Sequence, residues 1–510
     1  MNKRFSNYFY TITLRKFRFF SSALQLQLQM VHQTTGERDN AHFSPPINRS
    51  MKVLDRDFFT IKVPLTAIKV LDPREFKTLR TFEMDLLQLH GVTNIVKTFK
   101  ADGQAADFLI LLRPDLHDGE LEGMSERMKL YLAEHKEFPL VPYTLELGYK
   151  FWKPEEILSA VLPEELLTEI PTGFTLTGHI AHMNLRSQYL PYKYLIGQVI
   201  LDKNPSVETV VNKLDTIDTV FRTFEMEVIA GEKRYMVEHR ESDCIFRFDF
   251  SKVYWNSRLQ GEHLRLISMF KPGEAVCDVM AGVGPFALPA GKRHLVVFAN
   301  DLNGDSYASM QENIRINKVT DNVFAYNLDG RDFIRISISE LRKYASKKKT
   351  MLIPENTETA AESRTKKVRK LENSQRKSDQ AVENKDKKER KKTKQVPVPT
   401  EYAHYVMNLP HAAIEFLDAF RGLYRDDDDD DAITMPMVHV YCFHKSNDPE
   451  NPKPEESVVH PALRQRVADA LGYDIPLDEL SIHYVRLVAP SKTMHCVSFR
   501  LPRQVAFARD

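Results

Sequence analysis

The sequence predicts an α/β chain with three folded parts. The C-terminal part is expected to contain an open, mostly parallel sheet that ends in an antiparallel hairpin, and two smaller α/β units are expected before it. Three observations lead to this prediction. Residues 275–288 have the pattern of a buried strand, a glycine turn and a helix. A second apolar run, 295–301, ends in an acid, and the strand-like runs 482–488 and 495–501 flank a turn sequence.

The glycine turn within residues 275–288 is typical of a nucleotide-binding cradle. Gly282 and Gly284 let the backbone approach a ligand, and the helix that follows offers free N–H groups in its first turn. Gly282-x-Gly284-x-x-Ala287 also fits the loose dinucleotide pattern, so the turn alone leaves NAD and S-adenosylmethionine open. Asp278 lies four residues before the first glycine. The resulting Asp-x-x-x-Gly-x-Gly arrangement favours S-adenosylmethionine.

Composition limits the class of protein. The chain has 510 residues, 42% of them hydrophobic, which suits two to four domains. The net charge of +1 gives no global attraction to nucleic acid, so local patches must provide it. The four cysteines lack metal or redox spacing, and no run of about 18 apolar residues predicts a membrane span. His179 and His182 have no third partner at metal-ligand spacing, so we interpret them as structural and expect no metal.

Residues 1–45 are predicted to be a disordered mitochondrial targeting leader. The first acid of the chain is Glu37, and the residues before it include arginine, lysine, serine and phenylalanine. A basic tail without a targeting role is the alternative. Met30 and Met51 could start a second, non-mitochondrial form.

The first folded unit is expected over residues 55–115, where Phe59–Val63 alternates as a strand and Asp72-Pro73 starts a helix. The second unit is expected over 140–250, with a strand at 174–182. Its other expected elements are a helix over 190–201 and strands at 207–214, 223–229 and 234–238.

The third unit, residues 251–510, is expected to be interrupted by a disordered basic insertion at 345–398. Residues 364–394 carry 14 Lys/Arg and 5 Asp/Glu, a net charge of +9, with few large apolar residues. Such an insertion could contact RNA phosphates, and its composition suits a solvated linker equally well.

Polar residues follow several strands of the predicted parallel sheet. Asp301 follows the second strand and could accept both ribose hydroxyls of a nucleoside, and Asp329 follows the third. Open α/β sheets bind ligands at this edge, so Gly282 and these acids should converge. Asn408-Leu409-Pro410 follows the fourth strand, where its amide and carbonyl groups could hydrogen-bond a flat heterocycle.

Taken in order, these motifs resemble the eukaryotic and archaeal tRNA (guanine-37-N1)-methyltransferases. The segments that carry the resemblance are Arg258-Leu259, Glu262-His263, Asp278 to Phe286, Asp301-Leu302, Asp329-Gly330 and Asn408-Leu409-Pro410. The resemblance covers roughly residues 55–510 without the basic insertion. It implies a Rossmann-like methyltransferase domain behind two RNA-recognition domains, one for the outer corner of tRNA and one near the anticodon stem. It also implies mitochondrial-matrix, nuclear and cytoplasmic pools. Ser257 stands where the family often has proline.

The resemblance also implies roles for individual residues. It places around S-adenosylmethionine His263, Asp301, Leu302, Asp329, Gly330 and Asn408. Guanine N1 must lose a proton before it attacks the methyl group, so a base and a group that stabilises charge on O6 are required. Arg258 is the candidate for O6, and Glu262 is a candidate base. Asn408 and Pro410 would hold the flipped base in line with the methyl group.

The predicted activity is methylation of guanosine 37 beside the anticodon, which gives 1-methylguanosine and supports reading-frame maintenance. We expect the enzyme to bind the tRNA anticodon loop and outer corner as a monomer, with no membrane partner. Two alternatives stay open: a nicotinamide-dependent oxidoreductase and a non-catalytic tRNA-binding protein with a relic Rossmann domain.

Overall fold

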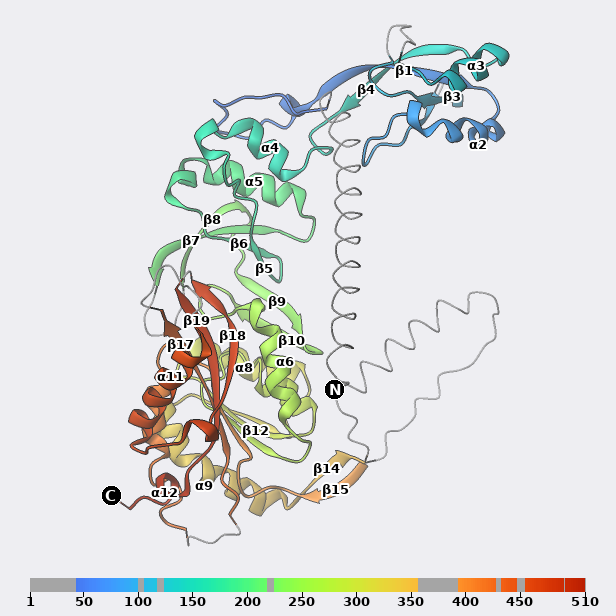
Figure 1. Cartoon of the computed structure of the whole chain (residues 1–510). Coiled ribbons are helices and arrows are strands. Elements are labelled where there is room, and N and C mark those ends of the chain that lie inside the picture. The colour runs from blue at the N-terminus through green and yellow to red at the C-terminus, as the bar shows by residue number, and fades with distance from the viewer. Residues whose placement is uncertain are drawn as a thin grey trace, which may run out of the picture. The chain divides into compact units, whose positions relative to one another are not determined.

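The computed structural model describes residues 43–99, 105–116, 123–217, 224–355, 393–427, 433–446, 455–489 and 491–509. The chain separates into two compact units, residues 1–173 with 185–205 and residues 174–184 with 206–510 (Figure 1). Nearly all of the predicted leader, and most of the predicted insertion, lie outside the described residues. Within the described ranges, no helix combines the length and apolar character needed to cross a membrane.

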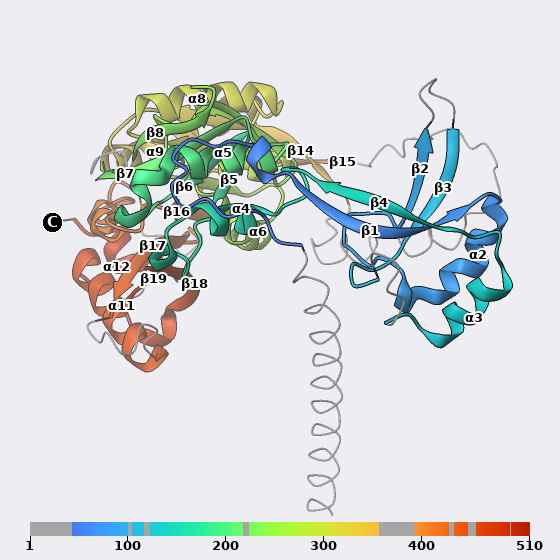
Figure 2. The same ribbon diagram turned by 90° about the horizontal axis from the view of Figure 1, so that it is seen from above.

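The first unit contains an antiparallel four-stranded sheet in the order β2-β3-β1-β4. Its strands are β1 (Ile61–Val70), β2 (Ile95–Phe99), β3 (Ala105–Leu111) and β4 (Leu140–Leu147). Figure 2 shows α2 (Phe76–Leu79) and α3 (Glu126–Glu134) together beside this sheet. Ser125 caps α3 by accepting a hydrogen bond from the Met128 N–H, which satisfies one free donor of the first turn.

Strand β4 lies outside the segment in which the sequence placed it. The sequence predicted that residues 140–147 belong to a unit over 140–250. In the structure, β4 pairs with β1 of the first unit, from Ile61↔Leu147 to Ile68↔Leu140. The pairing joins segments about 80 residues apart, and a local pattern carries no information on such a partner. The first unit also includes α4 (Pro154–Val161) and α5 (Lys193–Lys203). The remaining short helices of this unit are η1 (Asp57–Phe59), η2 (Pro73–Glu75), η3 (Arg80–Asp85), η4 (Glu164–Leu166) and η5 (Ser187–Tyr192).

The second unit begins with a small sheet in the order β5-β6-β7-β8. Its strands are β5 (Thr175–Thr177), β6 (Ile180–Met183), β7 (Thr209–Ile217) and β8 (Phe224–Gly231). The single strand expected at 174–182 is wrong, because the chain turns at Gly178, where φ is +56°. A Cβ there would lie 3.0 Å from the Cβ of Val237, so the turn requires glycine. The antiparallel hairpin of β9 (Met236–Glu241) and β10 (Cys244–Asp249) follows.

The main sheet has seven strands in the order β13-β12-β11-β16-β17-β19-β18. Its strands are β11 (Ala275–Asp278), β12 (Val296–Asn300), β13 (Val323–Tyr326), β16 (His404–Met407), β17 (Met437–Lys445), β18 (Ser481–Ala489) and β19 (Lys492–Arg500). The first five are parallel, and β19 and β18 are antiparallel. The predicted parallel sheet with a terminal antiparallel hairpin is confirmed.

Helices cover both faces of this sheet, because consecutive residues of each buried strand point to opposite faces. Val276 belongs to the same buried cluster as Leu266 of α6 and Met310 of α8, whereas Cys277 belongs to the cluster that contains Phe333 of α9 and Leu463 of α11. Figure 1 shows α6 and α8 on one side of the sheet and α9 and α11 on the other. The helices of this unit are η6 (Ser257–Leu259), α6 (Gln260–Met269), α7 (Ala287–Lys292), α8 (Gly304–Ile316), α9 (Gly330–Lys348), η7 (Ala413–Phe420), α11 (Glu456–Leu471), η8 (Leu477–Glu479) and α12 (Arg503–Ala506).

Residues at both ends of the predicted insertion, 345–398, form regular secondary structure. Helix α9 continues to Lys348, and β14 (Thr350–Pro354) pairs antiparallel with β15 (Thr393–Pro397). The segment between them, 356–392, lies outside the described residues.

Candidate active site

The glycine turn follows β11 and leads into α7. Gly282 and Gly284 have φ values of +57° and +98°, which other residues adopt rarely or at a cost. A Cβ on Gly284 would collide with the Leu288 side chain, so this glycine is needed for α7 to pack against the turn. A Cβ on Gly282 would meet nothing within 4 Å. The turn therefore has open space in front of Gly282, as the approach of a ligand requires.

Asp301 lies beside this turn at the end of β12. Its Oδ2 accepts a hydrogen bond from the Gly282 N–H at 2.8 Å, and its Oδ1 accepts one from the Asn303 N–H at 2.9 Å. Burial raises the pKa of Asp301, and these two N–H groups offset only part of that effect. A carboxylate offers about four lone-pair directions, so acceptor capacity remains for ribose hydroxyls.

Two polar side chains near the ends of the parallel strands have buried oxygens to which no described residue donates a hydrogen bond. Both oxygens of Asp278, at the end of β11, and the Oδ1 of Asn408, after β16, are buried and accept no hydrogen bond from the described residues. Burial, and next the nearby Asp301, raise the pKa of Asp278 well above its ordinary value. Unsatisfied buried acceptors are rare. The donor groups of S-adenosylmethionine would satisfy them, so these residues fit that cofactor.

Asn300, at the end of β12, forms hydrogen bonds with the residues that follow β11 and β13. Its Nδ2 donates to the carbonyl oxygens of Val279 at 3.1 Å and Leu328 at 3.0 Å, and its Oδ1 accepts from the Leu328 N–H at 2.8 Å. The ends of β11, β12 and β13 therefore meet at one edge, as predicted for Gly282, Asp301 and Asp329. Asn300 was not among the predicted site residues, although an amide next to the acid at a strand end was an available signal.

The third strand end supplies Asp329 and Gly330. Asp329 is exposed and caps α9, because its Oδ1 accepts a hydrogen bond from the Arg331 N–H at 2.9 Å. A Cβ on Gly330 would lie 3.0 Å from two ring atoms of Phe416, so glycine allows the helix to approach this ring. The guanidinium of Arg331 covers the ring at 4.3 Å. Leu302, at the neighbouring strand end, leaves 52% of its surface exposed, which suits contact with an apolar ligand face.

Gly330→Ala is expected to lower the affinity for S-adenosylmethionine by about three- to tenfold, because the added methyl group displaces Phe416, and overpacking of this kind costs about 1 kcal/mol or more. Isothermal titration with the cofactor measures the effect. Phe416→Leu in the same chain should restore part of the affinity. An unchanged affinity in Gly330→Ala would show that this contact does not shape the cofactor site.

The loop after β16 is tied to its surroundings through its backbone. The Leu409 carbonyl accepts from the Ala413 N–H at 2.7 Å, and the Pro410 carbonyl accepts from the Phe443 N–H in β17 at 2.9 Å. These bonds fix the turn that carries Asn408.

Arg258 belongs to η6, between the hairpin and α6. Asn256 caps this turn, since its Oδ1 accepts from the Arg258 N–H at 3.2 Å. The exposed guanidinium donates through Nη2 to Thr175 Oγ1 of β5 at 3.2 Å and keeps further donors for a substrate. Ser257, at the position where proline was expected, donates to the Leu176 carbonyl at 3.4 Å.

Glu262 is engaged by other side chains. Arg265 donates to its Oε2 at 2.7 Å and its Oε1 at 2.6 Å, and the Tyr441 hydroxyl donates to Oε1 at 2.8 Å. The His483 Nε2 lies 3.4 Å from Oε2. Three hydrogen bonds to its two oxygens occupy most of the acceptor capacity of this carboxylate. These partners favour a structural role for Glu262 over the predicted role as base.

Two of the three predicted histidines have polar contacts, and the third, His182, is partly buried. His263, on α6, is buried, and its Nδ1 lies 2.6 Å from Glu241 Oε1. The His179 Nε2 lies 3.1 Å from the Arg234 carbonyl. Burial lowers the pKa of His182 to about 4. In the described parts of the chain, no group of three or more His, Cys, Asp or Glu side chains could hold a metal ion.

Comparisons with known proteins agree with this geometry. The family described as "TRM5/TYW2 methyltransferase domain" matches residues 237–370, and that described as "TYW2 N-terminal domain" matches 155–234. The solved structure described as "The complex structure of aTrm5 and tRNALeu" has a TM-score of 0.51 and 18% sequence identity, and the match covers 86% of this chain and 99% of that chain. This similarity supports the α/β methyltransferase fold.

Curated relatives match along almost their whole length. A tRNA (guanine(37)-N(1))-methyltransferase of Schizosaccharomyces pombe is 45% identical over 467 residues, which cover 90% of this chain and 96% of the relative. The protein of the same name from Saccharomyces cerevisiae is 42% identical over 495 residues, which cover 91% and 95%. With this identity over most of both chains, and with the glycine turn, the strand-end acids and the Asn-Leu-Pro loop at one sheet edge, the chain belongs to the tRNA (guanine(37)-N(1))-methyltransferase family.

Proposed function

We propose that this protein transfers the methyl group of S-adenosylmethionine to N1 of guanosine 37 in tRNA. The observation that carries the proposal is the 45% identity to a tRNA (guanine(37)-N(1))-methyltransferase over 90% of the chain. The buried acceptors of Asp278 and Asn408, which have no hydrogen-bond partner among the described residues, support a cofactor site at the end of the parallel sheet. Neither alternative, an oxidoreductase or a non-catalytic tRNA-binding protein, has comparable support.

Cofactor binding is assigned to the residues at the strand ends. Asp278 and Asn408 would accept hydrogen bonds from the cofactor, and Asp301 would accept from its ribose while also holding the Gly282 N–H. Gly282 leaves room for the close approach. Bound S-adenosylmethionine supplies a methyl group on a positively charged sulfur, which is electrophilic enough for a ring nitrogen to attack.

The substrate side is assigned to Arg258, Asn408 and Pro410. Loss of the N1 proton places negative charge on guanine O6, and the permanently charged fork of Arg258 can donate to it. The hydrogen-bonded loop that carries Asn408 and Pro410 would hold the flipped base, so that N1 faces the methyl group. No residue is assigned as the base.

We also propose how the enzyme meets its tRNA and where it acts. The β1–β4 sheet is proposed to contact the outer corner of tRNA, and the second unit is proposed to hold the anticodon loop of the same tRNA. The enzyme is expected to act as a monomer. The basic, acid-poor sequence before Glu37 supports a mitochondrial-matrix pool, with nuclear and cytoplasmic pools beside it. Subcellular fractionation of the full-length chain and of one that starts at Met51 tests this assignment.

Incubation with unmodified tRNA and methyl-labelled S-adenosylmethionine is expected to give 1-methylguanosine on nucleoside analysis. A matched tRNA in which guanosine 37 is replaced by adenosine should give no labelled guanosine. Isothermal titration should detect binding of S-adenosylmethionine and should detect no binding of NAD. Cofactor binding without transfer to any tRNA would contradict the proposal in favour of a non-catalytic tRNA-binding protein.

A further inference from the structure

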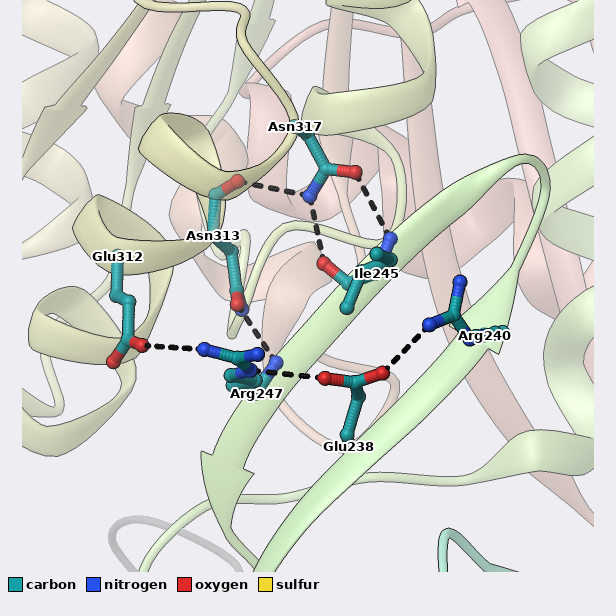
Figure 3. Close-up of polar contacts among 7 residues, drawn as sticks. All are labelled: Glu238, Arg240, Ile245, Arg247, Glu312, Asn313 and Asn317. Carbon is teal, nitrogen blue, oxygen red and sulfur yellow. Dashed lines mark hydrogen bonds and ion pairs between the residues drawn. The ribbon is translucent and has the colours of Figure 1, made fainter.

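The β9–β10 hairpin is hydrogen-bonded to residues of α7 and α8, the helices that follow the glycine turn and β12. Asn317, which caps the C-terminus of α8, pairs with the edge of β10 as a neighbouring strand would: its Nδ2 donates to the Ile245 carbonyl at 2.6 Å, and its Oδ1 accepts from the Ile245 N–H at 2.9 Å (Figure 3). The Oδ1 of Asn313 accepts from the Arg247 N–H at 2.7 Å. Its Nδ2 donates to the carbonyl of Val283, inside the glycine turn, at 3.3 Å. The hairpin and the turn thus share one side-chain amide.

The tip of the hairpin is also fixed. Glu241 pairs with Cys244 across a two-residue turn, in which Ser242 and Asp243 have φ values of +52° and +59°. Two non-glycine residues at positive φ are unfavourable and persist only where the surroundings hold them. Lys292, the last residue of α7, donates through Nζ to the Asp243 carbonyl. The turn and the strand that follow Glu241, the last residue of β9, are therefore held by contacts to α7 and to the C-terminal part of α8.

Glu241 occupies the inward face of β9, where it meets His263. Glu241 Oε1 lies 2.6 Å from His263 Nδ1, and the two side chains are 1% and 4% exposed. The other oxygen, Oε2, lies 3.8 Å from His239 Nε2 and has no hydrogen-bond partner among the residues described. Burial acts to raise the pKa of Glu241, but the nearby imidazoles of His239 and His263 outweigh it and hold the pKa below its ordinary value.

The ionised carboxylate of Glu241, next to Nδ1 of His263, determines the tautomer of this histidine. It requires a proton on Nδ1, so in the neutral ring Nε2 is the unprotonated acceptor. His263 lies on α6 with its ring edge-on to Phe286, the residue at which the glycine turn enters α7, at a centroid distance of 4.8 Å. Carboxylate partners fix ligand histidines in the same way in metal sites, where they set the tautomer and the ring orientation.

We propose that Glu241 is a positioning residue of the cofactor site, whose carboxylate holds His263 in the tautomer and orientation that present Nε2 to S-adenosylmethionine. The inference rests on the proposed function, because it gives a partner to a histidine that the family resemblance places at the cofactor. It makes the hairpin before the main sheet part of the cofactor site. The predicted strand at 234–238 stopped short of Glu241, so the alternation that points this acid inward was missed.

A double-mutant cycle on the full-length protein without tRNA tests the proposal, with cofactor affinity measured by isothermal titration. Glu241→Ala is expected to weaken S-adenosylmethionine binding by about tenfold, within the range seen when partners of ligand histidines are removed. Glu241→Gln should stay within about threefold of the wild type, because an amide oxygen still accepts the Nδ1–H. In a His263→Ala chain, Glu241→Ala should cause no further loss.

Glu238→Gln is the matched control, because Glu238 lies on the outward face of the same strand and pairs with the exposed Arg240 and Arg247. It should leave cofactor affinity unchanged. Melting temperatures identify variants that do not fold, and Glu241→Asp, which is too short for the contact, replaces Glu241→Ala in that case. Equal losses with and without His263, or a lower melting temperature with unchanged affinity, would overturn the proposal. Methyl transfer is assayed separately, so a chain that passes the cycle but methylates no tRNA contradicts the proposed function alone.

Discussion

Replacing Arg258 with alanine is expected to slow methyl transfer by about 10²–10³-fold, which is the usual cost of removing one donor to a developing oxyanion. The charge on guanine O6 exists only once the N1 proton has left, so the guanidinium stabilises the transition state more than bound tRNA. Affinity for S-adenosylmethionine should change little, because the contacts of Arg258 are to Asn256 and Thr175, neither of which is assigned to the cofactor. Arg258→Lys should restore only part of the rate, because an ammonium group lacks the planar fork.

Single-turnover kinetics at saturating tRNA measure this rate, and isothermal titration measures cofactor affinity. Arg335→Ala serves as the control, since Arg335 is an exposed arginine of α9 that pairs with Asp332. Its rate should match that of the wild type. If Arg258→Ala lowered cofactor affinity and rate by the same factor, the assignment of Arg258 to O6 would be wrong.

Gly284→Ala is expected to destabilise the second unit strongly. The residue would adopt φ near +98°, and its Cβ would collide with the Leu288 side chain. Backbone strain and overpacking each cost about 1–3 kcal/mol, a large part of the 5–15 kcal/mol that holds a typical domain folded. Thermal unfolding should show a melting temperature lower by several degrees, and S-adenosylmethionine binding should fall with it.

Gly282→Ala separates the cofactor effect from the folding effect. At φ +57° an alanine fits the left-handed region for about 1–2 kcal/mol, and its Cβ meets no protein atom within 4 Å. The methyl group would enter the open space before the turn, so cofactor affinity should fall more than stability does. If Gly282→Ala lowered the melting temperature more than Gly284→Ala does and left cofactor affinity less affected, the placement of the cofactor in front of Gly282 would be wrong.

The sequence predicted those parts of the site that depend on local pattern. The glycine turn and the acids Asp301 and Asp329 were found because each follows a short apolar run that forms a strand, and parallel strands bring such ends to one edge. Asn408 was found for the same reason. Each inference needed only the order of residues within one segment and the rule that ligands bind at that edge.

Long-range contacts account for what the sequence did not reveal. The partners of Glu262 include Tyr441, which is 179 residues away and reaches the carboxylate through the fold of the sheet. The pairing of β4 with β1, and the contact of Glu241 with His263, likewise join separate elements. Residue type and periodicity determine which face of an element is buried, but they do not identify the side chain across the interface.

The paired strands β14 and β15 have a consequence for protein engineering. They place Pro354 directly opposite Thr393, so whatever chain connects them need only close a gap of about 5 Å. For a flexible connection, doubling the length adds only about 0.6 kcal/mol of closure entropy. A connection engineered between Pro354 and Thr393 therefore starts and ends at neighbouring positions of one hairpin, so its length should cost the methyltransferase sheet little.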